Sequence, residues 1–154
     1  MCIRDSPKNI AAKVLPSVQR GESKVLALCQ RLKAPNDATR LATLCGLYID
    51  YFIQAKSAKP DVLLSLFDAC DAWRRPDQFR ALITITACLV ATDDMEPHKN
   101  LASITFLREA LALCSDVDTQ QFIEQGLTGK DIGAALYNAR KMQLANLQRQ
   151  FKLR

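Results

Sequence analysis

Histidine, glycine and long apolar runs are scarce in this chain of 154 residues, and each scarcity argues against a class of structure or function. A single histidine leaves neither a paired-imidazole metal site nor a base for a serine or cysteine nucleophile. Five glycines and six prolines, placed between apolar stretches, favour an all-helical chain over a β-sandwich with its frequent turns. No apolar run reaches the roughly 20 residues of a membrane helix, so the longest one, residues 81–91, predicts a buried core helix.

The six cysteines stand at positions 2, 29, 45, 70, 88 and 114, too far apart for Cys-x-x-Cys metal pairs. Five of them fall within apolar helical patterns, so we expect reduced core residues. A disulfide framework is the alternative, but a chain with a full hydrophobic core does not need one. Because no secretory signal is recognised, the expected location is the cytoplasm.

Two further features invite a metal or catalytic interpretation. Asp93 and Asp94 are adjacent carboxylates, which in such a loop are usually only solvated. His98 has no partner and is expected to be an exposed loop residue. The sequence therefore predicts no catalytic residue and no metal ligand.

Apolar residues recur at helical spacing along most of the chain, which predicts an all-α fold: a compact array of about six to seven helices with no sheet. Residues 56–59 are expected to form an exposed basic loop, and residues 93–99 a polar loop. The β-branched residues of the fourth segment leave a strand as the alternative there. The predicted helices cover residues 22–32, 37–55, 60–73, 77–92, 102–113, 118–126 and 130–150.

The net charge of +5 and the pI near 9.0 are compatible with a polyanionic partner, although many basic proteins bind no nucleic acid. Arg74 and Arg75, at the end of the third predicted helix, could grip phosphates with their forked donors, or could simply sit beside the helix carbonyls. Arg140 and Lys141 belong to a final helix that has no acid after Asp131, and its alternative is a solvated basic face.

Lys130 follows a glycine turn, Gly126 to Gly129, and starts the last predicted helix. A nucleoside-triphosphate loop is excluded because its spacing differs and because Asp131 stands where Ser or Thr is needed. A single phosphate at the helix N-terminus remains possible, with a plain turn as the alternative. The candidate phosphate-binding residues are therefore Arg74, Arg75, Lys130, Arg140 and Lys141.

Three blocks carry a family resemblance: residues 29–36, the block from Leu66 to Pro76 that ends in Asp-Ala-Trp-Arg-Arg-Pro, and residues 126–140. Their order and spacing, from about Val25 to Leu147, resemble the C-terminal, tRNA-binding part of bacterial CCA-adding enzymes of the multifunctional CCA protein type, the tRNA nucleotidyltransferases. The resemblance implies tRNA as the partner and a body and tail that hold the tRNA elbow. Magnesium, ATP and CTP would belong to an N-terminal catalytic head whose motifs are missing here, so this chain should be inactive alone.

The same resemblance suggests three segments. Residues 1–6 match nothing in the family and look like a translated adaptor, residues 7–56 correspond to the end of a phosphohydrolase-type region, and residues 57–154 are the C-terminal tRNA-binding region. The histidines expected near residues 15–21 and 48–52 are absent. A helical protein-interaction module that docks a partner or associates with itself through exposed apolar faces is the alternative from another class.

Overall fold

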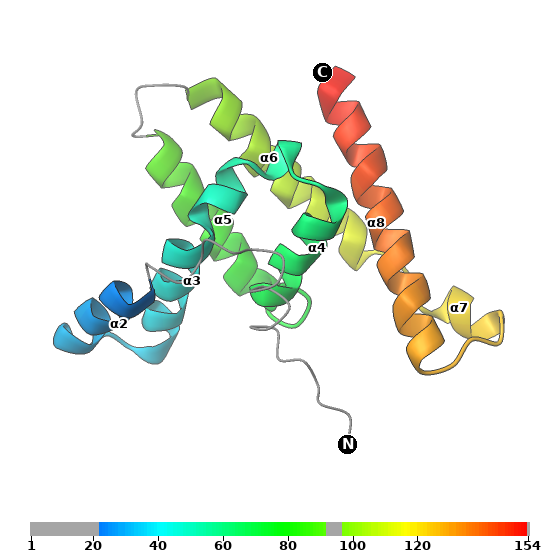
Figure 1. The fold of residues 1–154 in the computed structure, drawn as a ribbon, viewed down its shortest axis with the longest axis horizontal. Coiled ribbons are helices and arrows are strands. Elements are labelled where there is room, and N and C mark those ends of the chain that lie inside the picture. The colour runs from blue at the N-terminus through cyan, green and yellow to red at the C-terminus, as the bar shows by residue number, and fades with distance from the viewer. Residues whose placement is uncertain (1–21, 92–96, 154) are drawn as a thin grey trace.

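The computed structural model describes residues 22–91 and 97–153, and these residues form α-helices and one 3₁₀ turn with no strand (Figure 1). The predicted all-α class is confirmed, and the strand alternative for the fourth segment does not occur. Each predicted helix has a counterpart. The elements are α2 (Glu22–Arg31), α3 (Asn36–Ile53), η2 (Ala55–Ser57), α4 (Pro60–Ala69), α5 (Pro76–Ala91), α6 (Pro97–Ser115), α7 (Gln120–Glu124) and α8 (Lys130–Leu153).

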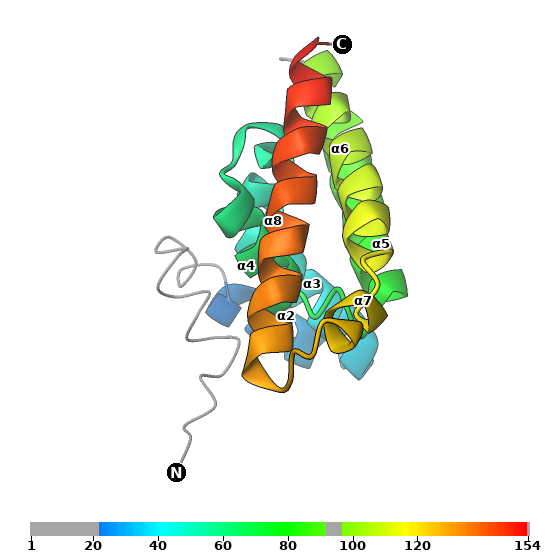
Figure 2. The ribbon, with the colours of Figure 1, turned by 90° about the vertical axis from the view of Figure 1, so that its right-hand side faces the viewer.

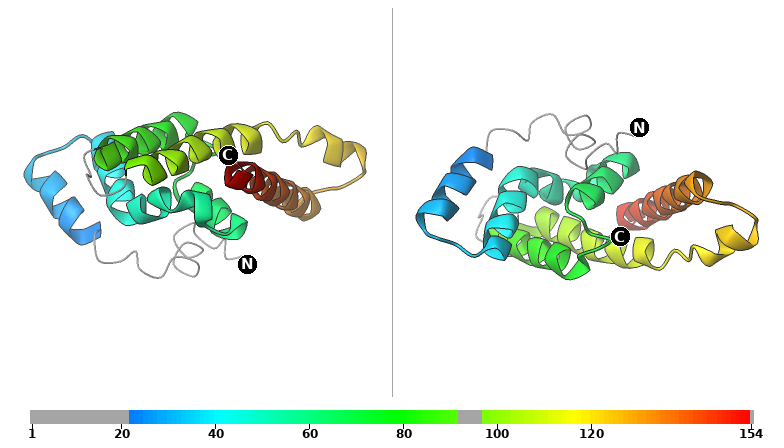
Figure 3. Two further views of the ribbon diagram at one scale, coloured as in Figure 1. Left: turned by 90° about the horizontal axis from the view of Figure 1, so that it is seen from above. Right: turned by 90° about the horizontal axis from the view of Figure 1, so that it is seen from below.

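The core forms where α5 packs between α3 and α6, while α8 packs along α6 and against α4. Figures 1 and 2 show the C-terminal half of α6 beside α8, and Figure 3 places α2 and α7 at opposite ends of the molecule. Aromatic rings connect the layers: the centroid of Phe79 lies 5.5 Å from that of Phe52 and 5.1 Å from that of Phe67. Such pairs add about 0.5–1.5 kcal/mol each beyond the free energy of burying their area.

The core does not stop between residues 56 and 57, where the family resemblance divides the chain. Tyr48, Phe52 and Ala55 belong to the same cluster of buried side chains as Leu63 and Phe67. The proposed correspondence of residues 7–56 to a phosphohydrolase-type region stays a prediction, because it concerns ancestry rather than packing. Residues 1–6, assigned to an adaptor, and residues 15–21 lie outside the described residues.

The third predicted helix is shorter than expected, because α4 ends at Ala69 and not at Trp73. The backbone N–H of Asp71 donates to the carbonyl of Asp68 at 3.1 Å, and that of Ala72 donates to the carbonyl of Phe67 at 2.9 Å. This pair of bonds is the Schellman ending, which requires a left-handed residue at the first position beyond the helix cap. Asp71 takes that conformation, with φ of 56°.

Two predicted loops also need correction. The loop before the fifth predicted helix ends earlier than expected, since α6 begins at Pro97 and places His98 in its first turn rather than in a loop. Proline is well suited to a first helical turn because its missing N–H would have no helical partner there. The segment after α3 contains η2, whose Ala55 is fully buried. Asp93 and Asp94 lie outside the described residues.

The sixth predicted helix, residues 118–126, is shorter in the structure, where α7 spans Gln120–Glu124. The N–H of Gln120 donates to the Asp118 carboxylate at 2.8 Å, and the Gln121 side-chain amide donates to the Asp118 carbonyl at 2.8 Å, so Asp118 and Gln121, although three residues apart, do not form a reciprocal capping box. Gly126, with φ of 82°, then supplies the left-handed residue after α7. This turn leads directly into α8 at Lys130.

Candidate nucleic-acid interface

Arg74 and Arg75 follow the left-handed turn at the end of α4 and lie beside its aspartate. The Nε atom of Arg74 is 3.8 Å from Oδ1 of Asp71, and the Nε atom of Arg75 is 3.8 Å from Oδ2. Their side chains are 81% and 48% exposed. Exposed ion pairs of this length contribute little stability, so both guanidinium groups are available to an external anion.

A third arginine, which the sequence did not suggest, reaches the same aspartate from α3. The Nη2 atom of Arg40 is 3.6 Å from Oδ2 of Asp71, and its Nε donates to Oε1 of Gln78 at 2.9 Å. Gln78 lies in the first turn of α5, so this hydrogen bond joins α3 to α5 across 38 positions of sequence. The three guanidinium groups of Arg40, Arg74 and Arg75 around Asp71 are called the arginine cluster below.

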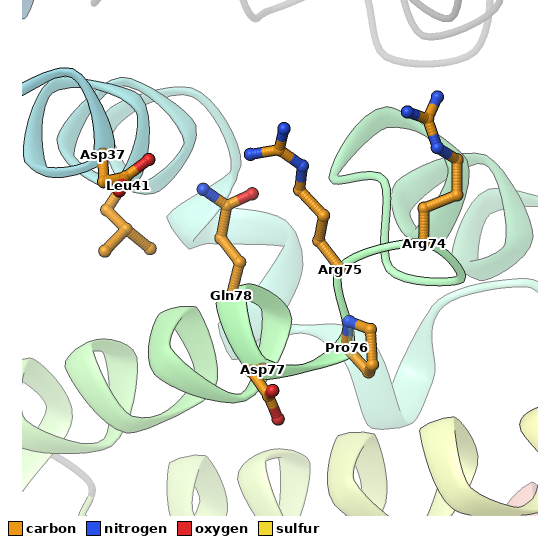
Figure 4. A pocket seen from close by; sticks show the side chains of 7 residues that line it. All are labelled: Asp37, Leu41, Arg74, Arg75, Pro76, Asp77 and Gln78. Carbon is orange, nitrogen blue, oxygen red and sulfur yellow. The ribbon is translucent and has the colours of Figure 1, made fainter.

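Arg74 and Arg75 line an open hollow of about 470 Å³, and Arg40 is hydrogen-bonded to Gln78, which also lines it. Figure 4 shows Arg74 and Arg75 extending their guanidinium groups away from the backbone of α5, while Asp37 and Leu41 approach from α3. Of the acids on the rim, Asp77 is paired with Arg80 at 2.8 Å. The hollow is lined by Asp37, Leu41, Arg74, Arg75, Pro76, Asp77 and Gln78.

Arg140, in contrast, is half-buried between helices. Its guanidinium carbon lies 3.8 Å from the centroid of the Trp73 ring, and its Nε donates to the carbonyl oxygen of Cys114 at 3.1 Å. Trp73 in turn donates from Nε1 to Oδ1 of Asp68 at 2.6 Å. Arg140 therefore connects α8 to the end of α6 and to the segment that follows α4.

Burial dominates the pKa values around this contact. Partial burial lowers the pKa of Arg140, which nevertheless stays a cation at any physiological pH. Burial raises the pKa of Asp68, against the opposing effect of its hydrogen bond from Trp73. Burial also raises the pKa of the Cys114 thiol to about 11, so this cysteine is neutral and unreactive near pH 7.

Lys141 is the next residue on α8, but it turns toward α4. Its Nζ lies 2.8 Å from Oδ1 of Asp61, and the same oxygen accepts a hydrogen bond from the Tyr137 hydroxyl at 2.7 Å. The hydrogen bond from Lys141, followed by that from Tyr137, lowers the pKa of Asp61. Lys141 is thus a paired cation that remains 44% exposed.

Lys130 stands apart from the other candidates, exposed at the first residue of α8 beside the α7 turn. It is ten residues from Arg140, which corresponds to about 15 Å along the helix axis. The structure therefore joins Arg74 and Arg75 and places Arg140 on the adjacent Trp73. Lys141 lies one position further along α8, and Lys130 lies at the far end. The assignment of these five residues to phosphate contacts stays a prediction.

Within residues 22–91 and 97–153, no group of three or more His, Cys, Asp or Glu side chains could hold a metal ion. The cysteines of the described part are free, and Cys29, Cys70 and Cys114 are buried as expected, whereas Cys88 is exposed. None of the helices described is both long and apolar enough to cross a membrane.

The fold and this surface define an all-helical chain that carries exposed arginines beside a left-handed turn. The chain is 30% identical over 141 residues to the multifunctional CCA protein of Thioalkalivibrio sulfidiphilus, covering 89% of this chain and 34% of that protein. It is 32% identical over 124 residues to the CCA-adding enzyme of Blochmanniella pennsylvanica, covering 77% of this chain and 29% of that enzyme.

These comparisons confirm the family resemblance: the chain is homologous to a C-terminal part of the CCA-adding enzymes. It spans about a third of the length of the curated relatives that it matches. No protein-family model matches the chain. No solved structure matches it either.

Sequence reasoning missed Arg40 and Asp71 for different reasons. Asp71 precedes Arg74 and Arg75 by three and four positions, a spacing that pairs charges within a helix and could have drawn attention to it. Arg40 carries no comparable local signal, since only the packing of α3 on α5 brings it to the turn. The arginine cluster is therefore a product of the tertiary structure.

Proposed function

We propose that this chain is a part of a CCA-adding tRNA nucleotidyltransferase and that its contribution is to bind the tRNA backbone through charge and shape. The observation that carries the proposal is its sequence similarity to proteins named for CCA addition, combined with exposed arginines on a rigid helical framework. Phosphate oxygens suit guanidinium groups because both present paired, planar hydrogen-bonding edges.

The chain supplies binding rather than chemistry in this proposal. Its predicted phosphate contacts are Arg74, Arg75, Lys130, Arg140 and Lys141, and Arg74 and Arg75 are more exposed than Lys141. The magnesium, ATP and CTP of the reaction would be held by a different part of the enzyme. We expect this function to be carried out in the cytoplasm, where tRNA is processed.

The test is to measure tRNA affinity of the chain at 50 mM and 200 mM salt, with a DNA duplex of equal length as the control. Each phosphate contact adds about 0.7–0.9 to the slope of log affinity against log salt. Three to five contacts therefore predict a loss of roughly 20- to 500-fold in affinity across this fourfold change in salt. Binding that is absent, or that is equal for tRNA and DNA at both salts, would contradict the proposal.

A second candidate, self-association, is favoured by one observation on α2. Leu28 on α2 and Leu32, the first residue after that helix, are 47% and 66% exposed, and the N–H of Leu32 donates to the carbonyl of Leu28. Sedimentation at rising protein concentration separates the two functions. A tight dimer that neither tRNA nor salt alters would favour association, whereas a monomer that shifts on adding tRNA favours RNA binding.

A further inference from the structure

We propose that Arg40 is a third phosphate ligand beside Arg74 and Arg75, and that Asp71 is the residue that positions all three around one backbone phosphate. This inference rests on the proposed tRNA-binding function. It adds a residue from α3 to the predicted phosphate contacts, which in the sequence analysis all lie after residue 57.

The position of Asp71 is set by the backbone. A left-handed conformation is uncommon outside glycine, although aspartate tolerates it better than most residues. The Schellman bonds from Asp71 and Ala72 hold this conformation. The carboxylate consequently stands at a fixed place between the end of α4, the start of α5 and the side of α3.

One carboxylate at this place faces three guanidinium groups, at 3.6 Å for Arg40 and 3.8 Å for Arg74 and Arg75. Asp71 neutralises one of the three positive charges and Asp37, which lines the hollow, offsets a second, so a surplus of one remains. The contacts of Arg74 and Arg75 are made through Nε, on the inner side of each guanidinium, so their terminal Nη donors lie further out. The arginine cluster therefore offers outward donors and surplus charge to an anion.

Arg40 is the most constrained member of the arginine cluster. Its Nε is held by Gln78 and its Nη2 by Asp71, and its side chain is 40% exposed. A side chain that is already ordered loses little rotamer freedom when it binds, and this loss is a main cost of binding through flexible arginines. Arg40 thus adds a preorganised donor to two more mobile ones.

The adjacent hollow is open to solvent and leaves room for a nucleotide unit beside the arginines. Its volume of about 470 Å³ accommodates a phosphate together with its sugar, and Leu41 and Pro76 give it an apolar wall. A chain of phosphodiesters fits this combination of surplus positive charge and open access. We therefore assign the hollow to one phosphodiester group of an RNA backbone.

Arg40→Gln tests the third ligand, with Arg108→Gln as its control, because Arg108 is also exposed but lies on α6, outside the arginine cluster and the hollow. We expect Arg40→Gln to weaken tRNA binding about three- to tenfold and to lower the salt slope by about one contact, or 0.7–0.9. Arg108→Gln should change the affinity less than twofold. Equal effects of the two variants would overturn the assignment of Arg40.

Asp71→Asn tests the positioning residue, and here the sign of the change is decisive. The substitution makes the chain more positive, so a simple charge effect predicts tighter binding to every nucleic acid. Loss of positioning predicts tRNA binding three- to tenfold weaker. Asp50→Asn, the same charge change at an exposed carboxylate on α3 that is about 15 Å along the helix axis from Arg40, should leave tRNA binding unchanged or slightly tighter.

Asp71→Gly is the second variant, since glycine keeps the left-handed backbone without a side chain. Both Asp71 variants should bind tRNA more weakly than the parent chain while they melt as cooperative folded proteins. If either folded variant binds tRNA as tightly as Asp50→Asn, Asp71 does not position the arginine cluster. If the parent chain itself binds no tRNA, the proposed function fails as well, so the two failures are distinct.

Discussion

Replacing Arg140 with alanine should destabilise the fold, because this side chain joins three parts of the core that are distant in sequence. The substitution removes the stacking of the guanidinium on Trp73 at 3.8 Å and the hydrogen bond to the Cys114 carbonyl at 3.1 Å. Stacking of a cation on an aromatic ring is worth about 0.5–2 kcal/mol, and a hydrogen bond from a charged donor about 1.5–3 kcal/mol.

Because Arg140 is only half-buried, the lower ends of these ranges apply. The expected loss is about 2 kcal/mol in the free energy of unfolding, which lowers the melting temperature by about 4–8 °C in a chain of this size. Arg140→Lys keeps the charge and most of the apolar stem but loses the planar stack, so it should lose about 1 kcal/mol.

Urea denaturation followed by tryptophan fluorescence suits this test, since Trp73 is the single tryptophan of the chain and lies in the contact itself. Circular dichroism reports the helices independently. The control is Arg149→Ala, an exposed arginine on the same helix, which should change stability by less than about 0.5 kcal/mol. Equal urea midpoints for the Arg140→Ala and Arg149→Ala variants would refute the role of Arg140 as a link between helices.

Three further predictions concern the core, the turns and pH. Phe79→Ala should cost about 3–5 kcal/mol, because the ring is fully buried against Phe52 and Phe67, and an unchanged urea midpoint would contradict this. Gly126→Ala should destabilise the chain by about 1 kcal/mol since φ is 82°, whereas Gly133→Ala, in open space on α8, should stabilise it by up to about 1 kcal/mol. The folded-state pKa of Asp61 is lowered, so its ion pair stabilises the fold above the ordinary value of 3.8 and is lost as pH falls below it. Asp61→Asn should therefore lower the melting temperature at pH 7 but not at pH 2, and an equal effect at both would refute this.

The positions of the helices could be predicted from the sequence because the responsible interactions are local. Apolar spacing, Pro60 and Pro76 at helix starts and Gly126 at a helix end act within a few residues of one another, so α3, α5 and α8 lie close to their predicted bounds. The end of α4 was misplaced because a left-handed aspartate, rather than the usual glycine, terminates it.

The candidate site could be predicted only in part from the sequence, and its geometry required the tertiary structure. The sequence indicated which cations to consider, since Arg74, Arg75 and the stretch without acidic residues after Asp131 can be read from it directly. The surroundings of these cations could not be predicted from the sequence. Arg140 lies on Trp73 while its neighbour Lys141 pairs with Asp61, because adjacent positions on a helix point in directions about 100° apart.

By itself, the sequence determined the all-helical class and the homology to CCA-adding enzymes, because the helical periodicity and the order of the motifs can be read without a structure. Only the tertiary structure decided which charges meet. Arg40 joins Asp71 because α3 packs on α5, and that packing follows from burying Phe52 against Phe79 rather than from any signal near Arg40 itself. Burial of apolar area is non-directional, so the charges that it brings together are fixed only once the helices have docked.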